Sequence, residues 1–288
     1  MTLAAASGGQ SAWALVRRFA ALLAVCAVVL QLCFALRIAL MALVDPQSTS
    51  FQRSEMWRMA TQQHRLAWQQ QWVAGPQISA HLKRAVIASE DTGFTEHSGV
   101  DWDALERAWQ RNQKASTQAE KINQRVEDRA ARDQTQPVPH GSTQDTAHAP
   151  AQKTARAIKV RAPVEPKVIG GSTITQQLAK NLFLSGERNL PRKAQECLIT
   201  LMLEALLDKP RILEIYLNSV EWGEGLFGAE AAAHHYFHVP AAQLSPMAAA
   251  RLAVMLPAPK RFEKRPDSAY VVSRAGTVAA RMGAVDVP

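Results

Sequence analysis

A short stretch beyond the middle of the chain holds the densest group of side chains that could bind a substrate. Residues 170–184 read GGSTITQQLAKNLFL and bring together two hydroxyls, two carboxamides, a lysine and an asparagine: Ser172, Thr173, Gln176, Gln177, Lys180 and Asn181. So many polar groups are costly to bury without partners, and an ordinary surface helix has no need of them. The composition of this stretch therefore indicates a binding site.

The spacing within this stretch predicts a helix with one polar and one apolar face. Thr173 followed three residues later by Gln176 fits a capping box, so the helix should begin here. The free N–H groups at such a helix start attract an anion. Gln177, Lys180 and Asn181 then share one face, while two leucines share another. The polar face is suited to bind a negatively charged group.

A second candidate site follows a predicted helix that Ser79 caps and that reaches Glu90, where residues 90–99 read EDTGFTEHSG. The negative end of the helix dipole should raise the pKa of the Glu90 carboxyl, which suits a general base. Asp91 is expected to bond local backbone in the turn that follows, and Phe94 to anchor the loop. The sequence thus predicts a base beside a tight turn.

Composition bounds the class of protein. The chain has 288 residues, of which 47% are hydrophobic, so it can bury one sizeable core plus an accessory segment. Its formal net charge of +8 suggests an acidic partner, which could be nucleic acid, an anionic membrane or a phosphorylated substrate. Three cysteines are too few for a disulfide framework.

An apolar stretch near the start predicts a membrane anchor over residues 19–44. It is long enough to cross a hydrocarbon core of about 30 Å, and it exceeds the apolar region of a typical signal peptide, the alternative. Arg17 and Arg18 place residues 1–18 in the cytoplasm, although Arg37 weakens the charge asymmetry. The body of the protein should then lie on the periplasmic side of an inner membrane, which excludes nucleic acid as a partner.

The remaining chain predicts a mainly α-helical protein with one insertion. Residues 45–71 form a membrane-proximal connector, either a helix along the membrane interface or a solvated connector helix. Residues 113–167 are poor in aliphatics and lack aromatics, which predicts a disordered insertion. No alternating pattern predicts a strand. Helices are expected at 79–90, 101–112, 173–184, 191–207, 210–218, 228–236, 245–256 and 267–283.

Five ordered segments resemble the motifs of the peptidoglycan glycosyltransferases, glycosyltransferase family 51. Glu90, Asp91, Phe94, His97 and Gly99 fit its first motif, ED-x-x-F-x-x-H-x-G, and GGSTITQQLAKN fits its second. RKAQE at 192–196, the segment at 212–233 and the segment at 249–266 resemble the third, fourth and fifth motifs. The resemblance covers roughly 72–283 and departs from the family by the insertion before the second motif.

The resemblance implies a lysozyme-like helical catalytic domain over 72–288, with a small lobe near the membrane. The family polymerises lipid II into glycan strands, inverts the anomeric centre and releases undecaprenyl pyrophosphate. Because no transpeptidase domain follows in this sequence, the expected activity is that of the monofunctional members. Expected partners are lipid II, the growing glycan strand, the inner membrane and other cell-wall synthases.

The resemblance also implies roles for particular residues. Glu90 would deprotonate the 4-hydroxyl of the acceptor sugar, and Glu196 would organise the side of the leaving group. Four cations would stabilise the departing pyrophosphate, namely Lys180, Arg188, Arg192 and Lys193. The donor site would be lined by Ser172, Thr173, Gln176, Gln177 and Asn181. His97 is expected to have a structural hydrogen-bonding role.

Several alternatives stay open at this point. The resemblance implies no cofactor, and it leaves open whether a divalent cation, Mg²⁺ or Mn²⁺, assists departure of the pyrophosphate. Glu230, His234 and His238 have helical spacing, but no further acid or cysteine completes a metal site. A lytic transglycosylase or lysozyme-like hydrolase would share the fold, and a non-catalytic cell-wall scaffold is the alternative from another class.

Overall fold

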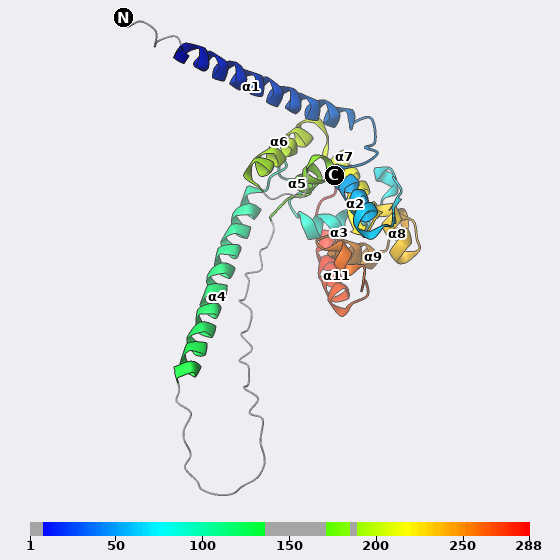
Figure 1. The fold of residues 1–288 in the computed structure, drawn as a ribbon. Helices are drawn as coiled ribbons and strands as arrows, with labels where there is room; N and C mark the ends of the chain where they lie inside the picture. Colours follow the sequence, from blue (N-terminus) through cyan, green and yellow to red (C-terminus); the bar gives the residue numbers. More distant parts are fainter. Residues whose placement is uncertain (1–7, 136–170, 185–188) are drawn as a thin grey trace, which may run out of the picture. The chain divides into compact units, whose positions relative to one another are not determined.

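The computed structural model describes residues 8–135, 171–184 and 189–288, and it is predominantly helical, as predicted (Figure 1). The chain divides into two compact units. One comprises Met1–Asp101 and Ser172–Pro288, and the other comprises Trp102–Gly171. The first unit contains the predicted site residues.

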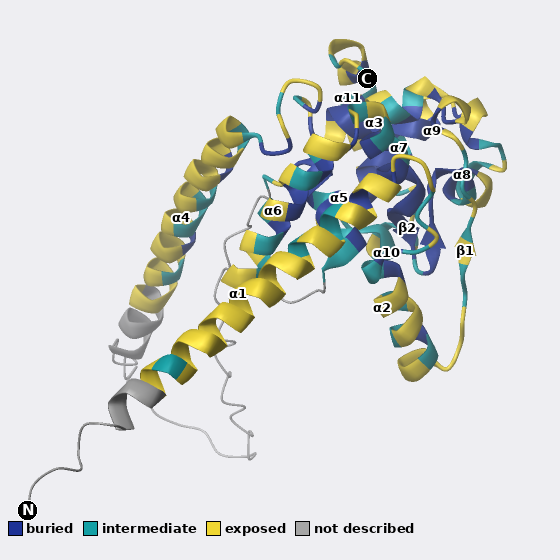
Figure 2. Ribbon diagram, turned by 90° about the horizontal axis from the view of Figure 1, so that it is seen from above, coloured by how far each residue is buried: buried dark blue, intermediate teal, exposed yellow. Residues whose placement is uncertain are grey.

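Helix α1 (Gly8–Leu40) is the predicted membrane anchor and begins earlier than residue 19. Its stretch Ala12–Leu40 is long and apolar enough to cross a membrane, and Figure 2 shows it almost entirely exposed. The carboxyl-terminal part packs on the rest of the unit, because Ile38 is fully buried. Gln31, a polar residue within the apolar run, exchanges hydrogen bonds of 2.8 and 3.0 Å with Gln195.

The core of this unit is a group of packed helices. Helix α9 packs against both α3 and α11, and α5 packs against α6 and α7. Figure 2 shows α3, α7 and α9 largely buried. The bounds are α3 Ala80–Glu90, α5 Ile174–Phe183, α6 Leu190–Leu206, α7 Lys209–Ser219, α9 Pro246–Met255 and α11 Ala269–Arg281.

Side-chain caps explain where these helices start. Each is preceded by a residue whose side-chain oxygen accepts a hydrogen bond from a backbone N–H of the first turn. These residues are Ser79, Thr173, Asn189, Asp208, Ser245 and Ser268. Helices α6, α7 and α9 also carry proline in the first turn, where the missing N–H costs nothing. The predicted starts are confirmed to within about two residues.

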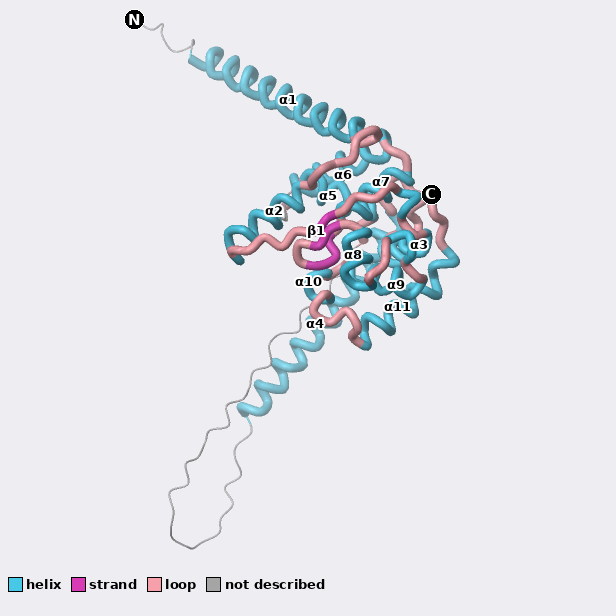
Figure 3. Tube along the Cα trace, turned by 90° about the vertical axis from the view of Figure 1, so that its right-hand side faces the viewer, coloured by secondary structure: helices cyan, strands magenta, loops and turns pink. Residues whose placement is uncertain are grey.

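A small three-stranded sheet corrects the expectation that the chain has no strand. Strands β1 (Gln69–Gln70), β2 (Glu221–Gly223) and β3 (Leu226–Phe227) lie in the order β1-β3-β2. Figure 3 shows the strands in magenta. They are too short to show an alternating pattern. Gly225 has a φ of 73°, and a Cβ there would lie 1.8 Å from the carbonyl oxygen of Ala67. The turn therefore requires glycine.

The predicted connector of 45–71 contributes to this sheet. It contains helix α2 (Ser50–Arg58), a short π-helix (Met59–Gln63) and strand β1, which pairs in parallel with β3. The ring centroids of Trp68 and Phe227 are 4.7 Å apart, whereas Trp57 is exposed. The connector is therefore integrated into the first unit.

The remaining elements of the first unit, among the described residues, are 3₁₀ turns at Gly75–Gln77, Ala241–Gln243 and Met282–Ala284, and helices α8 (Ala229–Phe237) and α10 (Pro259–Phe262).

In the second unit, helix α4 (Trp102–Thr135) corrects the predicted bounds of the insertion. The sequence predicts a helix that ends at 112 and disorder from 113, but the helix continues to Thr135. Its residues are good helix formers, and Ala108 and Ala119 are buried on one face. The low hydrophobicity of this segment concealed its helical spacing. The rest of the predicted insertion, 136–167, lies outside the described residues.

Candidate active site

The carboxylate of Glu90 lies at the end of α3 among neutral groups. The Gln177 side-chain amide donates a hydrogen bond of 3.0 Å to Glu90 Oε2, and Ser89 Oγ lies 3.4 Å from Oε1. Burial raises the pKa of the Glu90 carboxyl, the bond from Gln177 lowers it, and the neighbouring Asp91 raises it. The predicted direction is confirmed, but its main cause is burial and not the helix end.

A buried tyrosine fixes the orientation of Gln177. Tyr216 on α7 donates its hydroxyl proton to Gln177 Oε1 at 2.9 Å. Burial raises the pKa of this hydroxyl well above its usual value, so it remains a donor. Because Oε1 is occupied, the amide nitrogen of Gln177 must face Glu90. Sequence reasoning assigned no role to Tyr216, although it lies within the fourth motif.

Asp91 links two elements and does not bond local backbone through its side chain, contrary to expectation. Its Oδ2 accepts the backbone N–H of Ile174 at 2.9 Å, and its Oδ1 pairs with His97 Nε2 at 2.8 Å. An anion thus occupies the first turn of α5, as predicted for a helix start, but that anion is the protein's own carboxylate. His97 Nδ1 accepts the N–H of Gly99, so Nε2 carries the proton given to Asp91. These contacts favour the structural role expected of His97.

The turn after α3 is held tightly in place. Gly99 has a φ of 87°, and a Cβ there would lie 2.7 Å from Thr200, so only glycine fits. The Thr173 hydroxyl donates to the Gly99 carbonyl at 2.6 Å. Phe94 is fully buried, with the Lys209 ammonium 4.5 Å from its ring centroid. Phe94 therefore anchors the loop, as predicted.

A cavity of about 480 Å³ is lined by two groups of segments, which we call its α5–α6 wall and its α2–β2 wall. The α5–α6 wall is polar and consists of Ser172, Gln176, Gln177, Lys180, Asn181, Leu184, Arg192, Lys193 and Glu196. The α2–β2 wall is mostly apolar and consists of Phe51, Ser54, Val220, Glu221, Leu256, Pro257 and Pro259. Glu90 is not part of the lining, but Gln177 joins it to the cavity.

Glu196 is buried between two cations on α6. Its Oε2 accepts from Arg192 Nη1 at 2.9 Å, and its Oε1 pairs with the Lys193 ammonium at 2.5 Å. Spacings of three and four residues place all three side chains on one helix face. The Arg192 Nε is buried and has no hydrogen-bond partner in the described part of the chain. The cluster can therefore donate a further hydrogen bond to an anion in the cavity.

Most of the predicted substrate-binding residues meet at this cavity. The predicted polar face of α5 is confirmed, because Gln177, Lys180 and Asn181 line the cavity together. Thr173 does not line it, since its hydroxyl caps α5 and bonds Gly99. The Gln176 side chain caps α5 as well as lining the cavity. Arg188 lies outside the described residues.

The acidic groups near the cavity do not fit a metal ion. Among the residues that the structure describes, no group of three or more histidine, cysteine or acidic side chains could hold one. Glu196 is already paired with two cations. The Glu230 carboxylate accepts from the Ala241 backbone N–H and pairs with His234.

The family model described as Transglycosylase matches residues 58–124 and 150–283. The unmatched stretch, 125–149, is shorter than the predicted insertion. A biosynthetic peptidoglycan transglycosylase of Paraburkholderia phytofirmans is 44% identical over 252 residues, which cover 88% of this chain and 85% of the relative.

A second relative, from Burkholderia pseudomallei, has the same name and is 44% identical over 258 residues, covering 90% of this chain and 82% of the relative. The family match includes every cavity-lining residue except Phe51 and Ser54 of α2. Both the extent of the family match and the identity of the relatives show a common family. This chain belongs to the transglycosylase family, whose catalytic domain is lysozyme-like.

Proposed function

We propose that the chain polymerises glycan strands of peptidoglycan from lipid II, with release of undecaprenyl pyrophosphate. Its curated relatives are biosynthetic peptidoglycan transglycosylases, which supports this reaction class. One structural observation carries the proposal: Gln177 lines a cavity that also holds Lys180, Arg192 and Lys193, and the same side chain bonds Glu90. A base and an anion site are thereby joined through a single amide.

Glu90 acts as the general base in this reaction. It removes the proton of the acceptor 4-hydroxyl while that oxygen attacks C1 of the donor sugar, and the anomeric centre is inverted. Burial makes the ionised carboxylate a stronger base than an exposed glutamate. The hydrogen bond from Gln177 lowers the pKa of Glu90 and so opposes the effect of burial.

The α5–α6 wall holds the leaving group. Negative charge develops on the pyrophosphate as the bond to C1 breaks, and preorganised cations stabilise that charge. Lys193 is half exposed, and Arg192 retains one unpaired N–H, so both can donate to the phosphate oxygens. Glu196 holds these two cations in place, and Lys180 lies on the same wall.

The anchor supports a membrane-bound enzyme that acts on a lipid-linked substrate. Helix α1 fits a single-pass anchor, and its Gln31–Gln195 contact ties it to α6, which lines the cavity. Arg17 and Arg18 precede the apolar span and favour a cytoplasmic amino terminus. The catalytic unit then lies on the periplasmic face of the inner membrane, where cell-wall synthases could join it.

Purified full-length protein in detergent, incubated with fluorescent lipid II, tests the proposal. We expect glycan strands that lysozyme digests, and no muropeptides released from isolated sacculi. Release from sacculi without polymerisation would support the hydrolase alternative. Inactivity in both assays would support the non-catalytic scaffold.

A further inference from the structure

The α2–β2 wall of the cavity has no assigned role, and one charged residue stands in it. Five of its seven members are apolar. The hydroxyl of Ser54 is already engaged, because it donates to the Phe51 carbonyl at 2.7 Å. Glu221, the first residue of β2, is the remaining polar member of this wall. Burying an acidic side chain among apolar groups costs free energy, so a glutamate at this position calls for an explanation.

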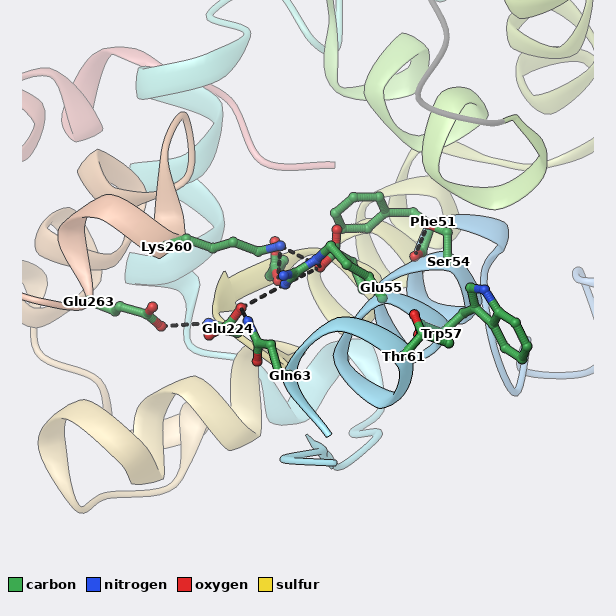
Figure 4. Close-up of polar contacts among 11 residues, drawn as sticks. Phe51, Ser54, Glu55, Trp57, Thr61, Gln63, Glu224, Lys260 and Glu263 are labelled. Atoms are coloured by element: carbon green, nitrogen blue, oxygen red, sulfur yellow. Dashed lines mark hydrogen bonds and ion pairs between the residues drawn. The ribbon is translucent and has the colours of Figure 1, made fainter. Parts of the chain in front are cut away.

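Glu221 is nearly buried and incompletely paired. Its side chain is 6% exposed, and its Oε1 is buried with no hydrogen-bond partner among the described residues. The Lys260 ammonium lies 3.5 Å from Oε1. That ammonium is directed to Glu55, with which it forms a short hydrogen bond (Figure 4). Among the described residues, Glu221 Oε1 therefore has a long ion-pair contact with Lys260 but no hydrogen-bond partner.

Glu221 lines the cavity at an irregular point of the sheet. Strands β2 and β3 pair with an irregular register between Glu221 and Gly223, as in a β-bulge. Such bulges re-aim a side chain at the end of a ladder. The last torsion of a glutamate has a broad range, and a turn of the carboxyl about it would bring the buried Oε1 toward a group in the cavity.

Ion pairs among the neighbouring residues stabilise the α2–β2 wall, but none of them gives Glu221 Oε1 a hydrogen-bond partner. Glu55 of α2 bonds both Lys260 and Arg58, and Arg58 in turn bonds Glu224 at 2.7 Å. Figure 4 shows Lys260 extended toward Glu55. The wall would thus be fixed by these pairs even without the carboxylate of Glu221.

We propose that Glu221 is a substrate-binding residue that accepts a hydrogen bond from a hydroxyl or amide N–H of the saccharide part of the substrate. Two cations neutralise Glu196, whereas Glu221 has only the long contact with Lys260, so its carboxylate would repel phosphate and its wall suits an uncharged part of the ligand. Apolar side chains beside one charged acceptor suit a sugar, which has apolar ring faces and polar edges. The proposal rests on the proposed function and specifies which wall holds the saccharide.

Direct binding of fluorescent lipid II in detergent tests this role. The background is Glu90→Gln, so that no substrate is consumed. Glu221→Leu keeps similar volume and removes the acceptor, and we expect its dissociation constant to rise roughly tenfold or more. Glu221→Gln keeps one acceptor oxygen and should show a smaller rise of about threefold. In the active background, KM should rise with little change in kcat.

Glu224→Gln is the matched control, because it breaks the Arg58 pair without touching the cavity lining. Its affinity for lipid II should equal that of the parent. Unchanged affinity in Glu221→Leu overturns the proposal, as does a loss that Glu224→Gln reproduces. Should Glu221→Leu fail to fold, unchanged affinity in Glu221→Gln overturns it equally. A parent that binds lipid II but forms no strands would contradict the proposed function alone.

Discussion

Two carboxylates of the catalytic unit are buried in different ways. Glu90 has neutral hydrogen-bond partners, and burial raises its pKa. Glu196 is held by Arg192 and Lys193 at 2.9 and 2.5 Å. A carboxylate without a cation is a useful base, whereas a carboxylate between two cations fixes those cations. Glu221, with one cation shared with Glu55, lies between these two cases.

The largest effect on stability is expected for Glu196, the carboxylate that is paired with two cations. Glu196→Leu leaves Arg192, a mostly buried guanidinium, without its carboxylate and should lower the free energy of unfolding by roughly 3 kcal/mol. Chemical unfolding of the detergent-solubilised protein measures this change. The double variant Glu196→Leu/Arg192→Met should recover most of the loss, because both charges are then removed. If Glu196→Leu were as stable as the parent, Glu196 and Glu90 would not differ in their contribution to stability as we expect.

Glu221 should destabilise the fold above neutral pH. Burial raises its pKa from 4.5 to about 7, although Lys260 lowers it and Glu55 raises it slightly. The folded state therefore binds this proton more tightly than the unfolded state, and stability falls as pH rises between these values. Glu221→Gln should gain up to about 3 kcal/mol over the parent at pH 8, at roughly 1.4 kcal/mol per pKa unit.

This advantage of Glu221→Gln should shrink toward pH 5, where the parent carboxyl is largely protonated in the folded protein. Unfolding curves at both pH values measure the difference. An advantage independent of pH would show that ionisation of Glu221 is not its source. A gain in stability together with weaker lipid II binding is the pattern expected of a residue retained for function.

Removing the hydroxyl that orients Gln177 should have a smaller effect. Tyr216→Phe should reduce kcat by less than about tenfold, because Gln177 can still face Glu90 but is no longer held there. KM should be unchanged. Tyr236→Phe removes a hydroxyl that donates to the Trp222 carbonyl at 2.9 Å and is the matched control. Equal losses in the two variants would mean that the effect is general and not transmitted through Gln177.

The pH dependence of activity tests whether the hydrogen bond from Gln177 sets the pKa of Glu90. Gln177→Leu removes a hydrogen bond that lowers the pKa of Glu90, so that pKa should rise further. The base must be ionised, and the acid limb of kcat/KM should therefore move to higher pH. Rates measured from pH 5 to 9 show the position of the limb. An unmoved limb would mean that another group controls it.

The sequence was most informative about the α5–α6 wall. Helical spacing and the Thr173 cap predicted the polar face of α5, and the motif resemblance added Arg192, Lys193 and Glu196 of α6. The α2–β2 wall joins residues from distant segments, such as Ser54 and Glu221, and no local pattern links them. The Asp91 contact with Ile174 spans 83 residues and was missed for the same reason.

The prediction of secondary structure from the sequence failed where the local pattern was weak. Strands of two or three residues, such as β1 and β2, are held by their pairing and not by alternation. Helix α4 was cut short because a polar, alanine-containing segment resembles a disordered one in composition. Its helical character depends on spacing, since Ala108 and Ala119 share a buried face. Composition alone could not distinguish the two.

The most direct test of the contrast between the two carboxylates is the turnover of lipid II by Glu90→Gln. We predict a fall in kcat of roughly 10²- to 10⁴-fold with binding retained, because only the proton acceptor is lost. Glu96→Gln alters an exposed carboxylate in the same turn and should behave as the parent. Parental turnover in Glu90→Gln would show that Glu90 is not the base and would contradict the account.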